Sequence, residues 1–441
     1  MKTHFSNAMY GALDYGAYPI GMLVVAPVVL HNLGVELFGV WTVANAVVST
    51  GGIIASGFGD ANIQHVASRR GAGDLDAPLR AARALMGINL MLGIAIAALG
   101  WMLSPLAAVH VSGSSPALRQ SCLWSLRIAC VMLTVRAIES VCITTQRAFE
   151  RYGAAVRVSV VARLLALATV AGLTFLSRSV VLLMGVTCVL TLAGLGLQLS
   201  RLKRLISADS LMPAFDRGTM SALMGFGIFS WLQAVSGVVF SQVDRLTLGI
   251  SLGAAAVASY ALCAQMAQPI YGFAASGLHF LFPYLSNRSA SASPAALRRP
   301  LLIAFAFNLV FVAASAGALL FLGNRILHAW AGAEIARSAA PIMPVIVWSS
   351  ALLGLNVTAS YALLALGRVR VVTWFNLASG AIMLLLMFYL TPRFGIQGIA
   401  FARLSYALIS LLLYIPLFGH FPGRRVMQQD MCALRPVKEE L

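Results

Sequence analysis

The chain alternates between long apolar stretches and short polar connections, and this pattern recurs twelve times along its 441 residues. Several stretches run without a charged residue for at least the roughly 20 positions that a membrane-spanning helix needs. Backbone polar groups in lipid must be bonded within their own segment, so each stretch is predicted to be an α-helix. The predicted spans are residues 8–30, 37–60, 84–105, 121–146, 155–177, 179–200, 219–243, 255–282, 301–322, 339–366, 371–391 and 396–418.

The amino-acid composition supports the prediction of membrane-spanning helices, because it is typical of a membrane protein. Hydrophobic residues make up 60% of the chain and charged residues 10%, with a mean hydropathy of +0.86. A soluble domain averages about 25% charged residues. The net charge of +17 could indicate a protein that binds nucleic acid. The arginines are spread over many short loops, however, which is typical of a membrane protein with cationic cytoplasmic loops, so no nucleic-acid partner is expected.

The distribution of cationic residues predicts how the helices are oriented. Alternate loops and both tails hold 21 Lys and Arg residues, whereas the opposite loops hold six. Cytoplasmic loops carry the excess, so both termini are predicted to be cytoplasmic. The first apolar segment carries Asp14 and runs too long for a signal peptide, so we expect it to remain as the first transmembrane helix.

An internal repeat predicts two halves of six helices. Leu33-Gly34 and Leu252-Gly253 are each followed by an aromatic residue at the same spacing, and the offset between them is 219 residues. Several arginines match at the same offset, which indicates duplication. Six helices per half is an even number, so the halves are parallel repeats. The predicted domains are a lobe over 1–205, a cytoplasmic linker over 206–218, a second lobe over 219–420 and a cytoplasmic tail over 421–441.

Four sequence blocks resemble one transporter family. They are Leu33-Gly34 with Gly39 and Trp41; residues 56–60 (SGFGD); residues 242–249 (QVDRLTLG) with Leu252-Gly253 and Tyr260; and residues 394–400 (FGIQGIA). Together they are similar to the polysaccharide flippases of the multidrug/oligosaccharidyl-lipid/polysaccharide exporter superfamily. The resemblance implies a V-shaped bundle of two lobes with a central cavity in the bacterial inner membrane. It also implies that the chain moves undecaprenyl-pyrophosphate-linked oligosaccharide for exopolysaccharide or O-antigen synthesis by alternating access, next to a polysaccharide polymerase and export machinery.

The deepest charged residues are the main candidates for the transport site. Charges inside a bilayer are expensive and usually mark a working site. Arg136 lies 11 residues before Arg147, about 16 Å along a helix, and Glu139 follows one turn later. The two side chains can therefore share a face, as a phosphate-binding arginine tuned by a neighbouring acid or as a neutralised structural pair. A guanidinium offers a planar, always charged fork that suits a pyrophosphate.

Three further arginines lie inside predicted spans. Arg127 is nine residues from Arg136, about 180° around the helix, and it is near enough to the outer surface to extend there. Arg163, some ten residues into the fifth span, is a second candidate phosphate contact. Arg403 is shallower, and it either extends outward or takes part in transport. The candidate substrate-binding residues are thus Arg136, Arg163, Glu139 and Arg127.

The acidic residues divide between a candidate coupling site and helix ends. Asp14 and Pro19 lie in the first span, where a proline bend beside an acid indicates a cation or proton site, or else an acid reaching headgroup water. Asp60 and Asp244-Arg245 are placed at helix ends, with interfacial ion pairing the favoured interpretation. The histidines, with His65 alone near the expected cavity, and the six cysteines lack ligand spacing, so no metal, cofactor or disulfide framework is predicted.

Two other classes of function stay open. A cation-coupled multidrug or small-molecule antiporter of the same superfamily would need acidic residues in its cavity, whereas the deep charges here are mostly basic. An oligosaccharide polymerase or ligase would need a large external loop carrying catalytic residues, and the longest such loops here are short. We therefore expect no enzyme activity, and the predicted partners are a lipid-linked anionic oligosaccharide and membrane lipid.

Overall fold

The computed structural model describes residues 17, 20–71, 74, 76–113, 115–149, 152–214, 216–278, 281, 285 and 294–420. The first half contains a helix over Ile20–Leu33 and then six labelled helices. These are α2 (Val35–Ser56), α3 (Gly59–Gly71), α4 (Ala77–Ser112), α5 (Pro116–Ala148), α6 (Tyr152–Thr174) and α7 (Val180–Leu205). α2 and the start of α3 form one candidate membrane span.

The second half is also a series of helices. It contains α8 (Arg217–Leu252), α9 (Ala254–Leu278), α11 (Pro294–Ala331), the short α12 (Ala333–Ala339), α13 (Met343–Ala365) and α14 (Val369–Phe394). α15 (Ile396–Ser410), the 3-10 turn η1 (Leu411–Leu413) and α16 (Tyr414–His420) follow one another and make up the last span.

The predicted membrane fold is confirmed. Within the described residues, eight helical segments are long and apolar enough to cross a membrane. α5, α8 and α9 are 33, 36 and 25 residues long and carry more polar side chains. With the first helix they complete an arrangement consistent with twelve helices in two lobes. Large apolar side chains such as Phe321 and Phe388 are 84% and 86% exposed, as expected for surfaces that face lipid.

Several helices are longer than their predicted spans. The span over 84–105 belongs to a helix over Ala77–Ser112, and the span over 219–243 belongs to a helix over Arg217–Leu252. The predictions stopped next to the charged residues Arg83 and Asp244 and at Pro105, but an α-helix continues beyond the hydrocarbon layer because its hydrogen bonds do not depend on lipid. Because α8 is longer than predicted, Asp244 lies within the helix. We had expected it at a helix end.

The repeated Leu-Gly pairs adopt the same backbone conformation. Gly34 precedes α2 and Gly253 precedes α9, with φ values of 83° and 81°. Their ψ values, 169° and −179°, also agree. A side chain is rarely compatible with these angles, so glycine serves as the break between consecutive helices at both positions. This match supports the duplication inferred from the 219-residue offset. The exact lobe boundaries remain a prediction.

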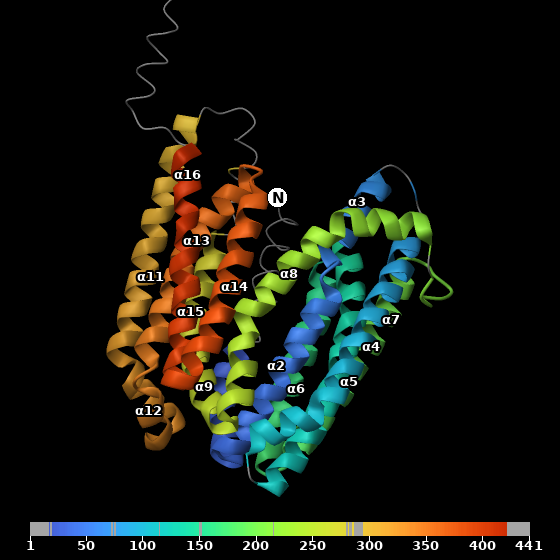
Figure 1. Cartoon of the computed structure of the whole chain (residues 1–441). Helices are drawn as coiled ribbons and strands as arrows, with labels where there is room; N and C mark the ends of the chain where they lie inside the picture. The colour runs from blue at the N-terminus through green and yellow to red at the C-terminus, as the bar shows by residue number, and fades with distance from the viewer. Residues whose placement is uncertain are drawn as a thin grey trace, which may run out of the picture.

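The two lobes meet at the lower end of Figure 1 and diverge toward the upper end. At the meeting point α2 and α9 touch backbone to backbone: a Cβ built on Gly39 would lie 1.9 Å from the carbonyl oxygen of Ala254. The indole N–H of Trp330, at the end of α11, donates to the carbonyl of Leu23 in the first helix at 3.0 Å. The end of α3 and the start of α8, which carry arginines predicted to be cytoplasmic, lie at the open, upper end (Figure 1).

Helix α8 crosses from one lobe to the other (Figure 1). In its first half, the indole N–H of Trp231 donates to the carbonyl of Ile54 in α2 at 2.8 Å. Near its end, Asp244 contacts α15 in the second lobe. The described part of α8 therefore connects the lobes physically as well as in sequence.

Candidate functional site

The predicted pair of Arg136 and Glu139 is formed in the middle of α5. Nη1 of Arg136 lies 2.9 Å from Oε2 of Glu139, one helical turn away. The Glu139 side chain is 4% exposed and the Arg136 side chain 25% exposed. The carboxylate is thus enclosed while part of the guanidinium stays accessible, and a guanidinium has five N–H donors in all.

Small residues in α2 allow α5 to bring Arg136 close. A Cβ built on Gly52 would lie 3.4 Å from Cβ of Arg136, and one built on Gly51 would lie 2.7 Å from Leu133. The side of α5 that carries Arg136 therefore faces α2. Because α2 also packs against α8 and α9, Arg136 lies on the side of its lobe that is directed toward the other lobe.

Behind the ion pair, a series of buried polar side chains connects three helices. The hydroxyl of Ser159 in α6 donates to Oε1 of Glu139 at 3.3 Å. The amide of Gln198 in α7 donates to Ser159 at 3.3 Å, and the amide of Gln146 in α5 donates to Gln198 at 2.7 Å. Ser159, Gln198 and Gln146 were not predicted. The seven-residue spacing of Glu139 and Gln146, about two helical turns, could have revealed Gln146, whereas no signal in the sequence indicated Ser159 or Gln198.

Arg127 is placed apart from this group. Its guanidinium carbon lies 4.9 Å from the ring centroid of Trp101 in α4 and 5.2 Å from that of Trp124 in α5. Two indole rings hold the cation by cation–π contact. Whether Arg127 binds substrate stays a prediction, but the structure does not bring it together with Arg136.

Arg163 lies on α6, four residues after Ser159, and its side chain is partly buried. Four residues are about one helical turn, so Arg163 is on the same side of α6 as the hydroxyl that binds Glu139. Its role in binding stays a prediction. Asp14 and Pro19, the candidates for coupling or gating, lie outside the described residues, as does the side chain of Asp60.

A second buried charged cluster, which the sequence analysis missed, lies in the other lobe. Nη1 of Arg403 in α15 lies 2.5 Å from Oδ2 of Asp244, and the hydroxyl of Tyr260 in α9 donates to the same oxygen at 2.6 Å. Asp244 is 1% exposed and Arg403 is 8% exposed. The expectation of interfacial pairing for Asp244 was wrong, because α8 continues past it. The alternative in which Arg403 extends outward is also wrong.

His65 lies in the middle of α3, two residues beyond Ile63, where the candidate membrane span ends. Partial burial lowers the pKa of its imidazole below 6.5, and the nearby charges of Arg69 and Arg80 lower it further. The imidazole therefore binds a proton less readily than an ordinary histidine side chain does.

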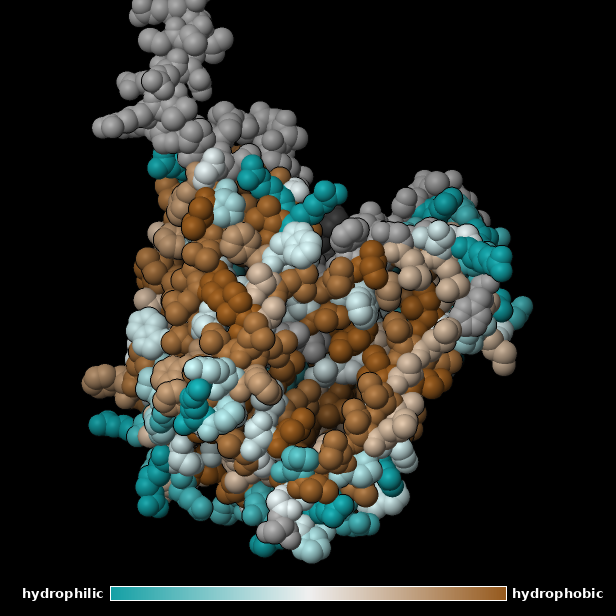
Figure 2. Space-filling model, in the orientation of Figure 1, coloured by the Kyte–Doolittle hydropathy of each residue, from teal (hydrophilic) through white to brown (hydrophobic). Residues whose placement is uncertain are grey.

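Between the lobes, the viewed face of the molecule is hollowed, and hydrophobic side chains cover most of the visible wall (Figure 2). Polar side chains gather at the upper and lower ends of the same view. The partly exposed guanidinium of Arg136, on the side of α5 that faces α2, has N–H donors that can bind an anionic group.

These features define a multi-pass membrane transporter fold. A family model described as "Polysaccharide biosynthesis protein" matches residues 7–288, more than half of the chain, so the chain belongs to that family. The predicted family is thereby confirmed. No curated protein matches the sequence.

Three solved structures illustrate the fold. A multidrug resistance MATE family transporter of the MOP superfamily, in an inward-facing conformation, has a TM-score of 0.71 and 13% identity, with 92% of this chain and 96% of that chain covered. The lipid II flippase MurJ, in an inward closed conformation, has a TM-score of 0.69 and 14% identity, with coverage of 92% and 88%. The eukaryotic MATE transporter AtDTX14 has a TM-score of 0.63 and 16% identity, with coverage of 94% and 95%. Among these neighbours, the MATE proteins are transporters and MurJ is a flippase, and each shares the fold of this chain.

Proposed function

We propose that this chain is a flippase that carries a lipid-linked anionic oligosaccharide across the bacterial inner membrane for exopolysaccharide or O-antigen synthesis. An undecaprenyl-pyrophosphate carrier has the chemistry that the site would recognise. The proposal joins the family of polysaccharide biosynthesis proteins with the resemblance in fold to a lipid II flippase. The lobes would alternate between a state open to the cytoplasm and a state open to the outside.

The observation that carries the proposal is the asymmetric exposure of the Arg136–Glu139 pair. The acid is enclosed and the guanidinium is partly open on the side of α5 that faces α2. A pyrophosphate oxygen would bind the open N–H groups by charge-assisted hydrogen bonds. Glu139 would compete for the same guanidinium and so keep the affinity modest, which lets the cargo leave on the other side.

The alternative function, a cation-coupled antiporter for drugs or small molecules, gains less support. A cationic cargo would need an accessible acidic side chain. The Glu139 carboxylate is already held by Arg136 and Ser159 and is 4% exposed. The likeness to MATE transporters concerns the fold, which both kinds of cargo share.

The test is polysaccharide export in cells that depend on this chain. We expect Arg136→Ala to lower surface polysaccharide at least tenfold and to leave lipid-linked oligosaccharide on the cytoplasmic side. Arg136→Lys should give intermediate activity, because it keeps the charge and loses the fork. Membrane levels of each variant are measured by immunoblot, so that loss of protein is not taken for loss of transport.

Arg119→Ala is the matched control, because Arg119 lies on the same helix and is exposed near its start. It should export at the level of the unmodified chain. Full export by Arg136→Ala at normal membrane level would refute the role of Arg136. Efflux of a cationic drug that disappears in Glu139→Gln would favour the antiporter instead.

A further inference from the structure

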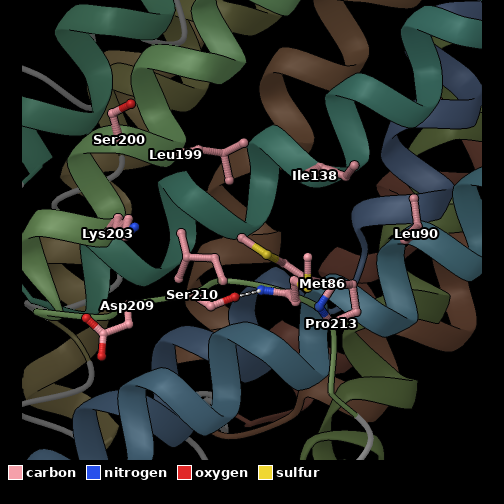
Figure 3. A pocket seen from close by; sticks show the side chains of 11 residues that line it. Met86, Leu90, Ile138, Leu199, Ser200, Lys203, Asp209, Ser210 and Pro213 are labelled. Carbon is pink, nitrogen blue, oxygen red and sulfur yellow. Dashed lines mark hydrogen bonds between the residues drawn. The ribbon is translucent and has the colours of Figure 1, made fainter.

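A preformed pocket lies on the first lobe, away from the region between the lobes. It has a volume of 480 Å³, within the range of about 300–1,000 Å³ that is common for ligand sites. Its walls come from α4, α5 and α7 and from the segment that follows α7. Figure 3 shows this pocket from close by.

The pocket is on the outer side of α5. Ile138, which lines it, is two residues after Arg136, and two residues correspond to about 200° around a helix. Since Arg136 faces α2, Ile138 faces the opposite way. On α4, Leu90 lines the pocket and its neighbour Met91 is 61% exposed, as expected next to lipid. The pocket therefore opens toward the membrane and not toward the transport route.

The lining is apolar at one end and charged at the other. Figure 3 shows Leu90 and Ile138 on one side of the pocket and Lys203 and Asp209 on the opposite side. The hydroxyl of Ser200 also lies at the charged side, and the hydroxyl of Ser210 lies nearer the middle, where it accepts a hydrogen bond from the backbone N–H of Met212 at 3.2 Å. An amphiphilic ligand fits such a lining better than a wholly polar or wholly apolar one does.

The segment that covers the pocket is held in place by α4 and α7. Nε of Arg83 donates to the carbonyl of Met212 at 2.9 Å, and the N–H of Ala214 donates to the carbonyl of Arg83 at 3.3 Å. At the other end, the N–H of Ala208 donates to the carbonyl of Lys203 at 3.1 Å. The pocket thus needs no rearrangement of this segment to receive a ligand.

From these observations we propose that the pocket binds a zwitterionic glycerophospholipid from the adjacent leaflet. The lipid phosphate lies at Lys203, its primary ammonium lies at Asp209, and one acyl chain follows Leu90 and Ile138. The carboxylate of Asp209 would repel a lipid that carries only negative charge. A headgroup with both charges is complementary to Lys203 and to Asp209. This site is distinct from the one proposed for the cargo.

The test is thermal unfolding of the delipidated full-length protein in detergent, with lipids added one at a time. Phosphatidylethanolamine should raise the Tm in a saturable way, because a ligand that binds the folded state stabilises it. Phosphatidylcholine cannot donate N–H bonds to Asp209, and phosphatidylglycerol has no ammonium, so both should need about tenfold higher concentration for the same shift. Equal responses to the three lipids would overturn the proposal, as would a stronger response to undecaprenyl phosphate.

Variants assign the effect to the pocket. Lys203→Ala and Asp209→Asn should each weaken the phosphatidylethanolamine response about tenfold. Leu90→Trp should abolish it by filling the apolar end. Arg204→Ala is the matched control, since Arg204 is an exposed cation next to Lys203 that does not line the pocket. If Arg204→Ala weakens the response as much as Lys203→Ala, binding is a general surface effect and the proposed site is wrong.

Discussion

Arg403 in α15 and Asp244 in α8 form an ion pair with 2.5 Å between Nη1 and Oδ2, although 159 positions separate them in the sequence. The hydroxyl of Tyr260 in α9 donates to the same carboxylate oxygen, and the backbone N–H of Arg245 donates to the other one at 2.8 Å. One carboxylate therefore joins three helices of the second lobe. Because α8 also packs against the first lobe, this cluster fixes one end of the helix that connects the two lobes.

Removing one partner of this pair should destabilise the protein strongly, because the other is left as a buried, uncompensated charge. We expect Arg403→Gln or Asp244→Asn to cost about 3–5 kcal/mol of unfolding free energy. The double variant should cost less than the sum of the two. Thermal unfolding of the purified variants in detergent measures this. Arg393→Gln, at an exposed cation near the end of α14, is the control and should change little. Additive losses would mean that the two charges do not stabilise one another.

A second prediction concerns the contact between Gly39 and Ala254, at the end of the molecule where the two lobes meet. Gly39→Ala places a methyl group where the carbonyl of Ala254 lies, so the backbones of α2 and α9 must separate. We expect this end to open more often, with faster labelling of a cysteine introduced at Ala254 by a water-soluble maleimide. Gly172→Ala is the control, because a Cβ at Gly172 meets nothing within 4 Å. Unchanged labelling in Gly39→Ala would show that the lobes do not separate there.

Much of the fold follows from the sequence because lipid leaves the backbone few choices. Twelve apolar stretches predict twelve helices, and the Leu-Gly pairs mark the same helix break in both halves. Arg136 and Glu139 could be paired from their spacing of three residues alone, since helix geometry puts such residues together. Local periodicity was sufficient for these features.

The features that the sequence analysis missed depend on contacts between distant helices. The pairing of Asp244 with Arg403 requires knowing that α8 continues past its apolar part and lies against α15. The amides of Gln146 and Gln198 are 52 positions apart and meet only because α7 packs on α5. Helix periodicity indicates which face a residue is on, but it does not indicate which helix covers that face.

A third prediction concerns the pKa of His65, which burial and the charges of Arg69 and Arg80 lower from 6.5. The unfolded chain therefore binds this proton more readily than the folded protein does. The resulting contribution to stability is present above pH 6.5 and is lost as the pH falls through that value toward the lower pKa of the folded state. Arg69→Gln should raise the pKa of His65. Asp74→Asn should lower it, because the negative charge of Asp74 raises the pKa of the nearby imidazole. Histidine-labelled NMR titration measures both shifts, with His65→Asn identifying the signal. A pKa unaffected by Arg69→Gln would remove that arginine as a cause.

The final prediction separates the two roles that Glu139 has in the proposed mechanism, as a structural hydrogen-bond acceptor and as a competitor for Arg136. Glu139→Gln has nearly the same shape, and its amide oxygen can still accept a hydrogen bond. It removes the negative charge, however, so Arg136 loses its counterion. We expect tighter binding of a pyrophosphate-containing lipid, by about tenfold, together with slower export.

The measurements are binding of undecaprenyl pyrophosphate to the purified protein and polysaccharide export in cells. The slower export has a physical reason: a cargo held too tightly leaves the site too rarely on the far side of the membrane. Glu139→Asp is the matched control, because it keeps the charge. It should bind the lipid about as strongly as the unmodified chain does. If Glu139→Gln binds more weakly than the unmodified chain while remaining folded, Glu139 does not compete with the cargo, and the pair holds α5, α6 and α7 together instead.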